Sequence, residues 1–161
     1  MLNHYLNMIQ EGRIMTRNAN APCAAYETVY GKKCPHIMGR YPKSHKTQLW
    51  NGILVDGNLN KKWLHDLNQI KQIEMRSSCE GHDENWLSYI IFRLRDSNLE
   101  KKPYLDQLVS KIEKTDSITK SAWVIGKQGR PRIVVAAKTW FGQPDWKNWW
   151  DSLASRIKQV F

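Results

Sequence analysis

The sequence predicts an α/β protein of the α+β kind, and three observations favour it. Short apolar segments are bounded by Gly, Pro, Asn or Asp, which is typical of strands. Longer segments between them carry apolar residues at helical spacing. The chain has 161 residues, of which 41% are hydrophobic and 25% charged, so it can bury a sizeable core. We therefore expect a single domain over residues 1–161.

The first 48 residues are expected to form an irregular extension packed on an α/β core of residues 49–161. Residues 1–20 show only weak helical periodicity. Residues 21–48 contain three prolines and two glycines among cationic side chains. This composition predicts a long loop, and long loops in compact domains are often functional.

The core is expected to begin with a strand, a helix and a second strand. Residues 49–55 have the apolar character of a strand and are followed by an Asp-Gly turn. Residues 59–70 repeat apolar side chains at helical spacing, with Asn58 as a suitable N-cap. Residues 73–78 predict a short second strand.

The second half of the core is expected to contain three strands and a helix. Residues 86–92 are nearly continuously apolar, which suits a central strand covered on both faces. A helix should run from about residue 98 to residue 114, with Pro103 in its first turn. Residues 121–126 and 132–137 predict a hairpin.

A final helix, opened by Pro144 and Asp145, carries a tryptophan-rich apolar stripe that should pack on the sheet. The predicted order is β-α-β-β-α-β-β-α. Its first six elements match the ferredoxin-like arrangement, a two-layer core with helices on one face of a sheet. The sequence thus predicts a ferredoxin-like core with an added strand and a C-terminal helix.

The net charge of +10 is concentrated at the two ends of the chain. Residues 1–49 carry seven Lys or Arg against two acids, residues 50–118 ten against eleven, and residues 119–161 eight against two. Such a surface attracts polyanions, of which nucleic acid is the commonest, and we expect RNA rather than DNA. The alternative is that the charge only keeps the protein soluble.

No apolar run approaches the roughly 20 residues that span a bilayer, and the N-terminus lacks the features of a signal peptide. The sequence therefore predicts a cytoplasmic protein with no membrane partner. Three cysteines, Cys23, Cys34 and Cys79, are an odd number at irregular spacing, which favours reduced thiols over a disulfide framework.

The candidate site is the turn at residues 77–82, which combines hydroxyls, a thiol, a carboxylate and an imidazole. An imidazole of His82 that reaches the sulfur of Cys79 would lower the thiol pKa and create a nucleophile. Asp56 could reach the same edge of the sheet. We expect Cys79, His82 and Asp56 to be catalytic. The remaining turn residues, expected to line the pocket, are Ser77, Ser78, Glu80 and Gly81.

Two simpler interpretations stay open for this turn. A single cysteine at a strand end is usually a small buried hydrophobe, and a single histidine in a loop is usually solvated. A metal site is the third interpretation. Its four ligands would be Cys34, His36, Cys79 and His82. The Cys-x-His spacing of the first pair is not a usual zinc spacing, so we expect no metal.

Two basic loops are candidates for contact with nucleic acid. Their residues are Arg40, Tyr41 and Lys43 in the first loop, and Lys127, Arg130 and Arg132 in the second. The cations could bind phosphates, and the ring of Tyr41 could stack on a base. The alternative is two solvated loops.

The pattern Leu67-Asn68, eight residues, then Ser77-Ser78-Cys79-x-Gly81 resembles the signature of the wybutosine-pathway tRNA methyltransferase family. The resemblance covers about 25 residues and implies S-adenosylmethionine as methyl donor and a modified guanine in tRNA as substrate. Glu80 stands where the family has a serine, and His82 stands where it has an arginine. The turn also resembles uncharacterised bacterial and phage proteins with a Ser-Cys-x-Gly-His turn, which imply no activity.

The sequence therefore favours a nucleic-acid-directed enzyme, related to tRNA-modifying methyltransferases. The alternative is a non-catalytic basic nucleic-acid-binding protein of the phage or plasmid type.

Overall fold

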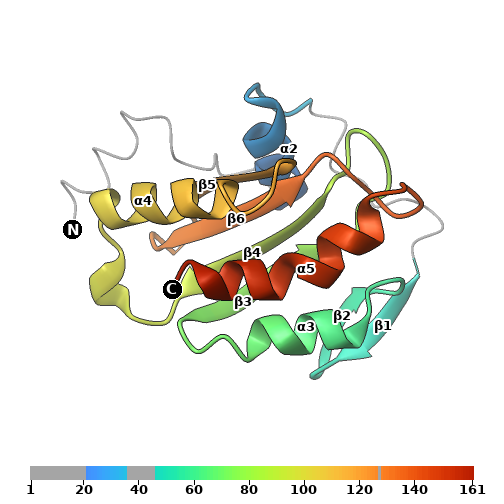
Figure 1. The fold of residues 1–161 in the computed structure, drawn as a ribbon, viewed down its shortest axis with the longest axis horizontal. Coiled ribbons are helices and arrows are strands. Elements are labelled where there is room, and N and C mark those ends of the chain that lie inside the picture. The colour runs from blue at the N-terminus through green and yellow to red at the C-terminus, as the bar shows by residue number, and fades with distance from the viewer. Residues whose placement is uncertain (1–20, 36–45, 127) are drawn as a thin grey trace.

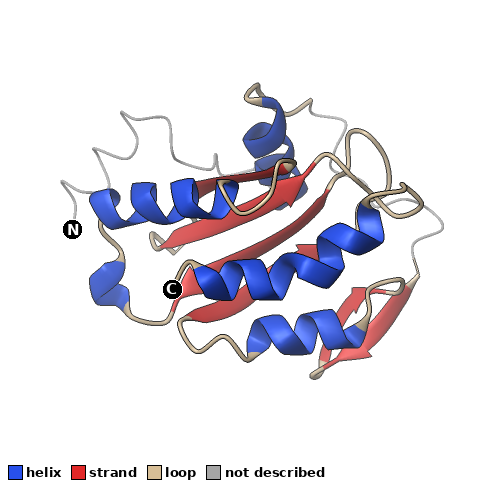
Figure 2. Ribbon diagram, viewed as in Figure 1, coloured by secondary structure: helices blue, strands red, loops and turns tan. Residues whose placement is uncertain are grey.

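The computed structural model describes residues 21–35, 46–126 and 128–161, which form a mixed α+β fold as predicted (Figures 1 and 2). In chain order the elements are α2 (Ala21–Tyr30), β1 (Thr47–Trp50), β2 (Ile53–Asp56), α3 (Lys61–Asn68), β3 (Ile73–Cys79), β4 (Ser88–Leu94), the 3₁₀ helix η2 (Ser97–Leu99), α4 (Lys102–Glu113), β5 (Thr119–Ile125), β6 (Pro131–Ala137) and α5 (Trp146–Gln159).

Four of the strands form an antiparallel sheet in the order β3-β4-β6-β5. The expected central strand at residues 86–92 is confirmed as β4, and the expected hairpin is confirmed as β5–β6. Helix α4 leads from β4 to β5, so β6 lies between two strands that run in the same direction. Pro103 lies in the first turn of α4, as predicted.

The expected first strand is instead a separate hairpin. Its strands β1 and β2 pair with each other around Asn51-Gly52, a two-residue turn in which both φ angles are positive. In the ferredoxin-like order this first strand would lie beside β4, a place that β6 occupies here. The reason is burial: residues 133–137 of β6 are apolar and buried on both faces, whereas the hairpin leaves Leu49, Ile53 and Leu54 exposed.

One face of the sheet is covered by α3, α4 and α5, which lie in front of it in Figure 1. The tryptophan stripe of α5 is buried there as predicted, with Trp149 and Trp150 at most 2% exposed. Asn60, rather than the predicted Asn58, caps α3, because its side chain accepts a hydrogen bond from the Lys62 amide.

The opposite face is covered in part by α2, which lies behind the sheet in Figure 1. Ala24, Ala25 and Tyr26 pack in one buried cluster with Ile91 and Val134 of the central strands. The prediction of an irregular segment at residues 21–48 is therefore wrong for Ala21–Tyr30. The weakly helical residues 1–20 lie outside the described residues.

The prediction of three reduced thiols is also wrong, because a disulfide joins Cys23 of α2 to Cys34 and leaves Cys79 as the free cysteine. No helix within the described ranges is long and apolar enough to span a membrane.

Candidate functional site

Three predicted catalytic side chains meet at one end of the sheet. Asp56 is the last residue of β2, Cys79 is the last residue of β3, and His82 lies in the turn that follows. One carboxylate oxygen, the sulfur and one ring nitrogen all lie within 4.8 Å of one another. The Nε2 atom of His82 is 3.9 Å from Oδ2 of Asp56. We call this group the Asp-Cys-His cluster.

The backbone of Glu80 anchors the turn that positions the cluster. Its carbonyl accepts hydrogen bonds of 2.6 Å from the Ser88 hydroxyl and from the Trp146 indole, and its amide donates to Oδ2 of Asp56 at 2.7 Å. Glu80 is only 1% exposed. The turn is therefore tied to β4, α5 and β2 at a single residue, and Glu80 has a structural position rather than the predicted pocket-lining one.

Gly81 gives the turn its shape, with a φ of +83°. A Cβ atom there would lie 2.8 Å from the Ser88 amide nitrogen and from Trp140. Glycine is thus needed here because β4 and Trp140 of the protein itself pack against its backbone. Gly81 does not line the pocket, which corrects the expectation that a ligand approaches the backbone here.

The surroundings of Cys79 do not favour a thiolate. Burial raises the pKa of its thiol well above the usual value, and the nearby charge of Asp56 raises that pKa further. Hydrogen bonds from the Gly81 amide and the Trp86 indole oppose this rise without cancelling it. Cys79 is therefore held as a protonated thiol, whereas the sequence predicted an activated nucleophile.

His82 is the most accessible member of the cluster. Its side chain is 15% exposed, against 7% for that of Asp56. The amide of His82 donates to the Trp86 carbonyl at 2.7 Å, and the Trp86 ring lies edge-on to the imidazole at a centroid distance of 5.9 Å. The turn therefore fixes the imidazole near Asp56, with its Nε2 atom buried and a small part of the side chain exposed.

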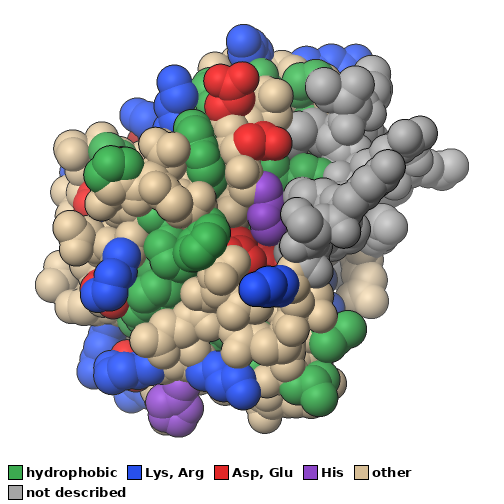
Figure 3. All heavy atoms as spheres, turned by 90° about the vertical axis from the view of Figure 1, so that its right-hand side faces the viewer, with side chains coloured by type: hydrophobic (Ala, Val, Ile, Leu, Met, Phe, Trp, Pro, Cys, Tyr) green, Lys and Arg blue, Asp and Glu red, His purple; other side chains and the backbone are tan. Residues whose placement is uncertain are grey.

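A pocket of about 520 Å³ opens beside the cluster, between β3, an edge strand of the four-stranded sheet, and the β1–β2 hairpin. Its lining comprises Thr47, Trp50, Ile53, Leu54, Val55, Asp56, Leu64, Met75, Arg76, Ser77, Ser78, Cys79 and Tyr89. The predicted lining by Ser77 and Ser78 is thus found. Figure 3 shows the end of the molecule that carries the hairpin, where apolar side chains gather and a histidine lies beside acidic side chains.

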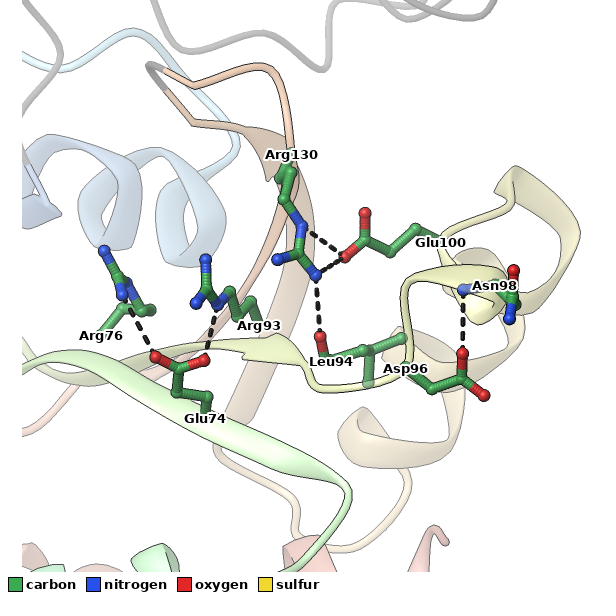
Figure 4. Close-up of polar contacts among 8 residues, drawn as sticks. All are labelled: Glu74, Arg76, Arg93, Leu94, Asp96, Asn98, Glu100 and Arg130. Carbon is green, nitrogen blue, oxygen red and sulfur yellow. Dashed lines mark hydrogen bonds and ion pairs between the residues drawn. The ribbon is translucent and has the colours of Figure 1, made fainter. Parts of the chain in front are cut away.

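Arg76 lines this pocket and also belongs to a group of cations that we call the arginine cluster: Arg76, Arg93, Arg130 and Arg132. Glu74 accepts from Arg76 at 3.3 Å and from Arg93 at 2.8 Å (Figure 4). The other three arginines lower the pKa of Arg132, after the larger effect of its burial. Nη1 of Arg132 is buried and has no hydrogen-bond partner among the described residues.

The arginine cluster extends the α2-facing side of the sheet. Side chains alternate along a strand, and Ile91 and Val134 face α2, so Arg93 and Arg132 face the same side two residues along. Arg130 is less available for phosphate binding than predicted, because its guanidinium pairs with Glu100 and donates to the Leu94 carbonyl at 3.1 Å (Figure 4).

Several predicted residues do not join the site. The four-ligand metal set is wrong, because Cys34 is bonded to Cys23. Five predicted residues lie outside the described residues: His36, Arg40, Tyr41, Lys43 and Lys127.

No protein-family model, curated protein or solved structure matches this chain.

Two parts of the site were missed from the sequence. The hairpin wall of the pocket was missed although Asn51-Gly52 is the strongest short hairpin signal. Arg76 and Arg93 were missed because only strand pairing brings them beside Arg132; nothing in their spacing along the chain signals it.

Proposed function

We propose that this protein is a nucleic-acid-directed enzyme whose reactive centre is the Asp-Cys-His cluster. The observation that carries the proposal is the meeting of these three side chains, whose ligand-type atoms lie within 4.8 Å of one another. Asp56 and Cys79 line the pocket, and His82 lies beside them outside its lining. Convergent polar groups in a largely apolar pocket are the usual features of a small-ligand or catalytic site.

The chemistry available to the cluster is proton transfer. The Nε2 atom of His82, 3.9 Å from the carboxylate of Asp56, can accept or donate a proton. The raised pKa of the Cys79 thiol makes that thiol a weak acid, so it would orient or pack against a reacting group rather than give up its proton. Such groups suit proton abstraction or leaving-group protonation better than attack by a thiolate.

The arginine cluster supports the choice of a nucleic-acid substrate. A guanidinium group can donate two parallel hydrogen bonds to one phosphate. Among the described residues, two carboxylates, those of Glu74 and Glu100, pair with arginines of the cluster. Because Arg76 belongs to both the pocket and the cluster, a nucleotide held in the pocket would have its backbone beside the arginines.

The family resemblance adds tRNA modification and S-adenosylmethionine to the proposal. The pocket volume of about 520 Å³ suits an adenosine-sized group, Trp50 and Tyr89 offer aromatic surface, and Asp56 offers a carboxylate. S-adenosylmethionine would supply the methyl group. Calorimetry with S-adenosylmethionine alone tests this part, and a lack of heat removes the methyl donor from the proposal.

The enzyme proposal is tested by incubating bulk tRNA with the protein and S-adenosylmethionine and analysing the nucleosides by mass spectrometry. We expect a methylated nucleoside with the wild type and none with His82→Ala, whose RNA affinity should be unchanged. His65→Ala is the matched control, because His65 is exposed on α3.

The alternative is a non-catalytic nucleic-acid-binding protein, which the arginine cluster favours independently of the pocket. It would bind RNA and yield no altered nucleoside with the wild type or any variant. That result, obtained with folded protein, would replace the enzyme proposal by this one.

A further inference from the structure

The Asp-Cys-His cluster combines three side-chain types that bind transition metals. Around a tetrahedral zinc ion with bonds of about 2.0–2.3 Å, the ligand atoms are roughly 3.3–3.7 Å apart. Here the three candidate atoms lie within 4.8 Å of one another, and the nitrogen–oxygen pair of His82 and Asp56 is 3.9 Å apart. Small side-chain movements would bring all three to coordination distance.

The local chain favours such a site. Cys79 and His82 are separated by two residues, which falls within the two to four residues that separate paired cysteine ligands in zinc sites. The positive φ of Gly81 turns the chain between them, and the hydrogen bond from the Glu80 amide orients the carboxylate of Asp56. Supporting hydrogen bonds of this kind orient ligands at established metal sites.

We propose that Asp56, Cys79 and His82 form a transition-metal site, for which zinc is the best-suited ion, with a fourth coordination position open to the pocket. A mixed thiolate, imidazole and carboxylate set suits zinc, whereas magnesium and calcium prefer oxygen ligands alone. Three protein ligands with one open position are the arrangement of catalytic rather than structural zinc.

On binding, a sulfur–zinc bond replaces the S–H bond of Cys79, and the thiol proton leaves to solvent. A water molecule at the open position would then become a stronger acid. Binding of the ion rests on the geometry of the cluster; only its use in a reaction rests on the proposed function. With the ion bound, His82 and Cys79 would serve as ligands, and the acid available to a reaction would be that water.

The test is a titration of the full chain with zinc alone, in competition with a chromophoric chelator, followed by cobalt to detect a sulfur-to-cobalt charge-transfer band. We expect one equivalent to bind and the band to appear. Cys79→Ser should abolish the band, and Cys79→Ser and His82→Ala should each weaken zinc binding by about 100-fold or more. His65→Ala should bind zinc like the wild type.

Circular dichroism shows which variants fold. If Cys79→Ser does not fold, His82→Ala still tests the site, because His82 is the more exposed position. The proposal is overturned if the wild type takes up no stoichiometric zinc, or if folded His82→Ala keeps full affinity. RNA assays separate the two proposals. If the protein binds zinc but modifies no RNA, the metal site is supported and the proposed function is not. If RNA modification needs His82 but continues in the presence of a chelator, the proposed function is supported and the metal site is not.

Discussion

At the scale of single residues, Cys79 gives the most direct test of the site. Its thiol is 3% exposed and its pKa is raised, so the thiolate that reacts with disulfide reagents is scarce near neutral pH. We expect native protein, kept free of reductant and metal, to react slowly with a thiol reagent at pH 7–8. One thiol per chain should react quickly after denaturation, because Cys23 and Cys34 are bonded to each other. Fast reaction of the native protein, or three reactive thiols after unfolding, contradicts this expectation.

Gly81 tests how tightly the turn is built. Gly81→Ala forces an alanine into a φ of +83° and brings its Cβ against Trp140 and the Ser88 amide. We expect the free energy of unfolding to fall by about 2–4 kcal/mol in urea denaturation. Gly52→Ala is the matched control, because its φ is +78° but a Cβ there would meet nothing within 4 Å. It should cost only about 1 kcal/mol, and equal losses of stability in both variants would exclude tight packing at Gly81 as the cause.

At the scale of elements, Glu74 couples β3 to β4 through charge. Hydrogen bonding to Arg93 holds the pKa of Glu74 below its ordinary value of 4.5. A carboxyl whose pKa is depressed by folding adds stability above its unfolded pKa, and that stability is lost as pH falls through the folded pKa. Thermal melts should therefore show wild type more stable than Glu74→Gln at pH 6, with the difference shrinking below pH 4.5. The effect should be small because both side chains are partly exposed and solvent screens the pair, and a difference that grows in acid contradicts it.

The disulfide should stabilise α2 against the sheet. It closes a short loop between residues 23 and 34. The bond lowers the conformational entropy of the unfolded chain, which stabilises the folded protein by about 2–3 kcal/mol. We expect the double variant Cys23→Ser/Cys34→Ser to lose that much stability in denaturant titrations. Wild type under reducing conditions should match the double variant, which separates loss of the bond from any effect of the serine side chains.

At the scale of the whole molecule, the charge of +10 predicts RNA affinity that falls with salt. Fluorescence anisotropy with a single-stranded RNA should show a linear fall of log K against log salt concentration. Arg93→Ala should reduce that slope by about 0.7 for each phosphate that Arg93 neutralises in the wild type. Lys147→Ala removes the same charge from α5, which covers the opposite face, and should leave the slope unchanged. Equal effects of the two variants would indicate a diffuse charge effect without a defined arginine site.

Local sequence signals predicted most elements, and two missed ones also carried signals. In α2, Pro22 in the first turn and Gly31 just after the last residue, with φ +66°, are typical helix boundaries. The Asn51-Gly52 turn likewise indicated the hairpin. The helix was missed because the proline- and glycine-containing composition of residues 21–48 predicted a loop. The hairpin was missed because the apolar character of residues 49–55 predicted one continuous strand.

The sequence by itself determined the α+β class, the central strand β4, the buried tryptophan stripe of α5 and the proximity of Cys79 and His82 where β3 ends, because these depend on neighbours within a few residues. Only the tertiary structure decided that β6 replaces the first strand beside β4, and that Asp56 and the four arginines reach their partners. It also reversed the expected pKa of Cys79, because burial and the charge of Asp56 come from segments distant in the chain. Strand order and desolvation are set by which surfaces can be buried together, and no local pattern records that.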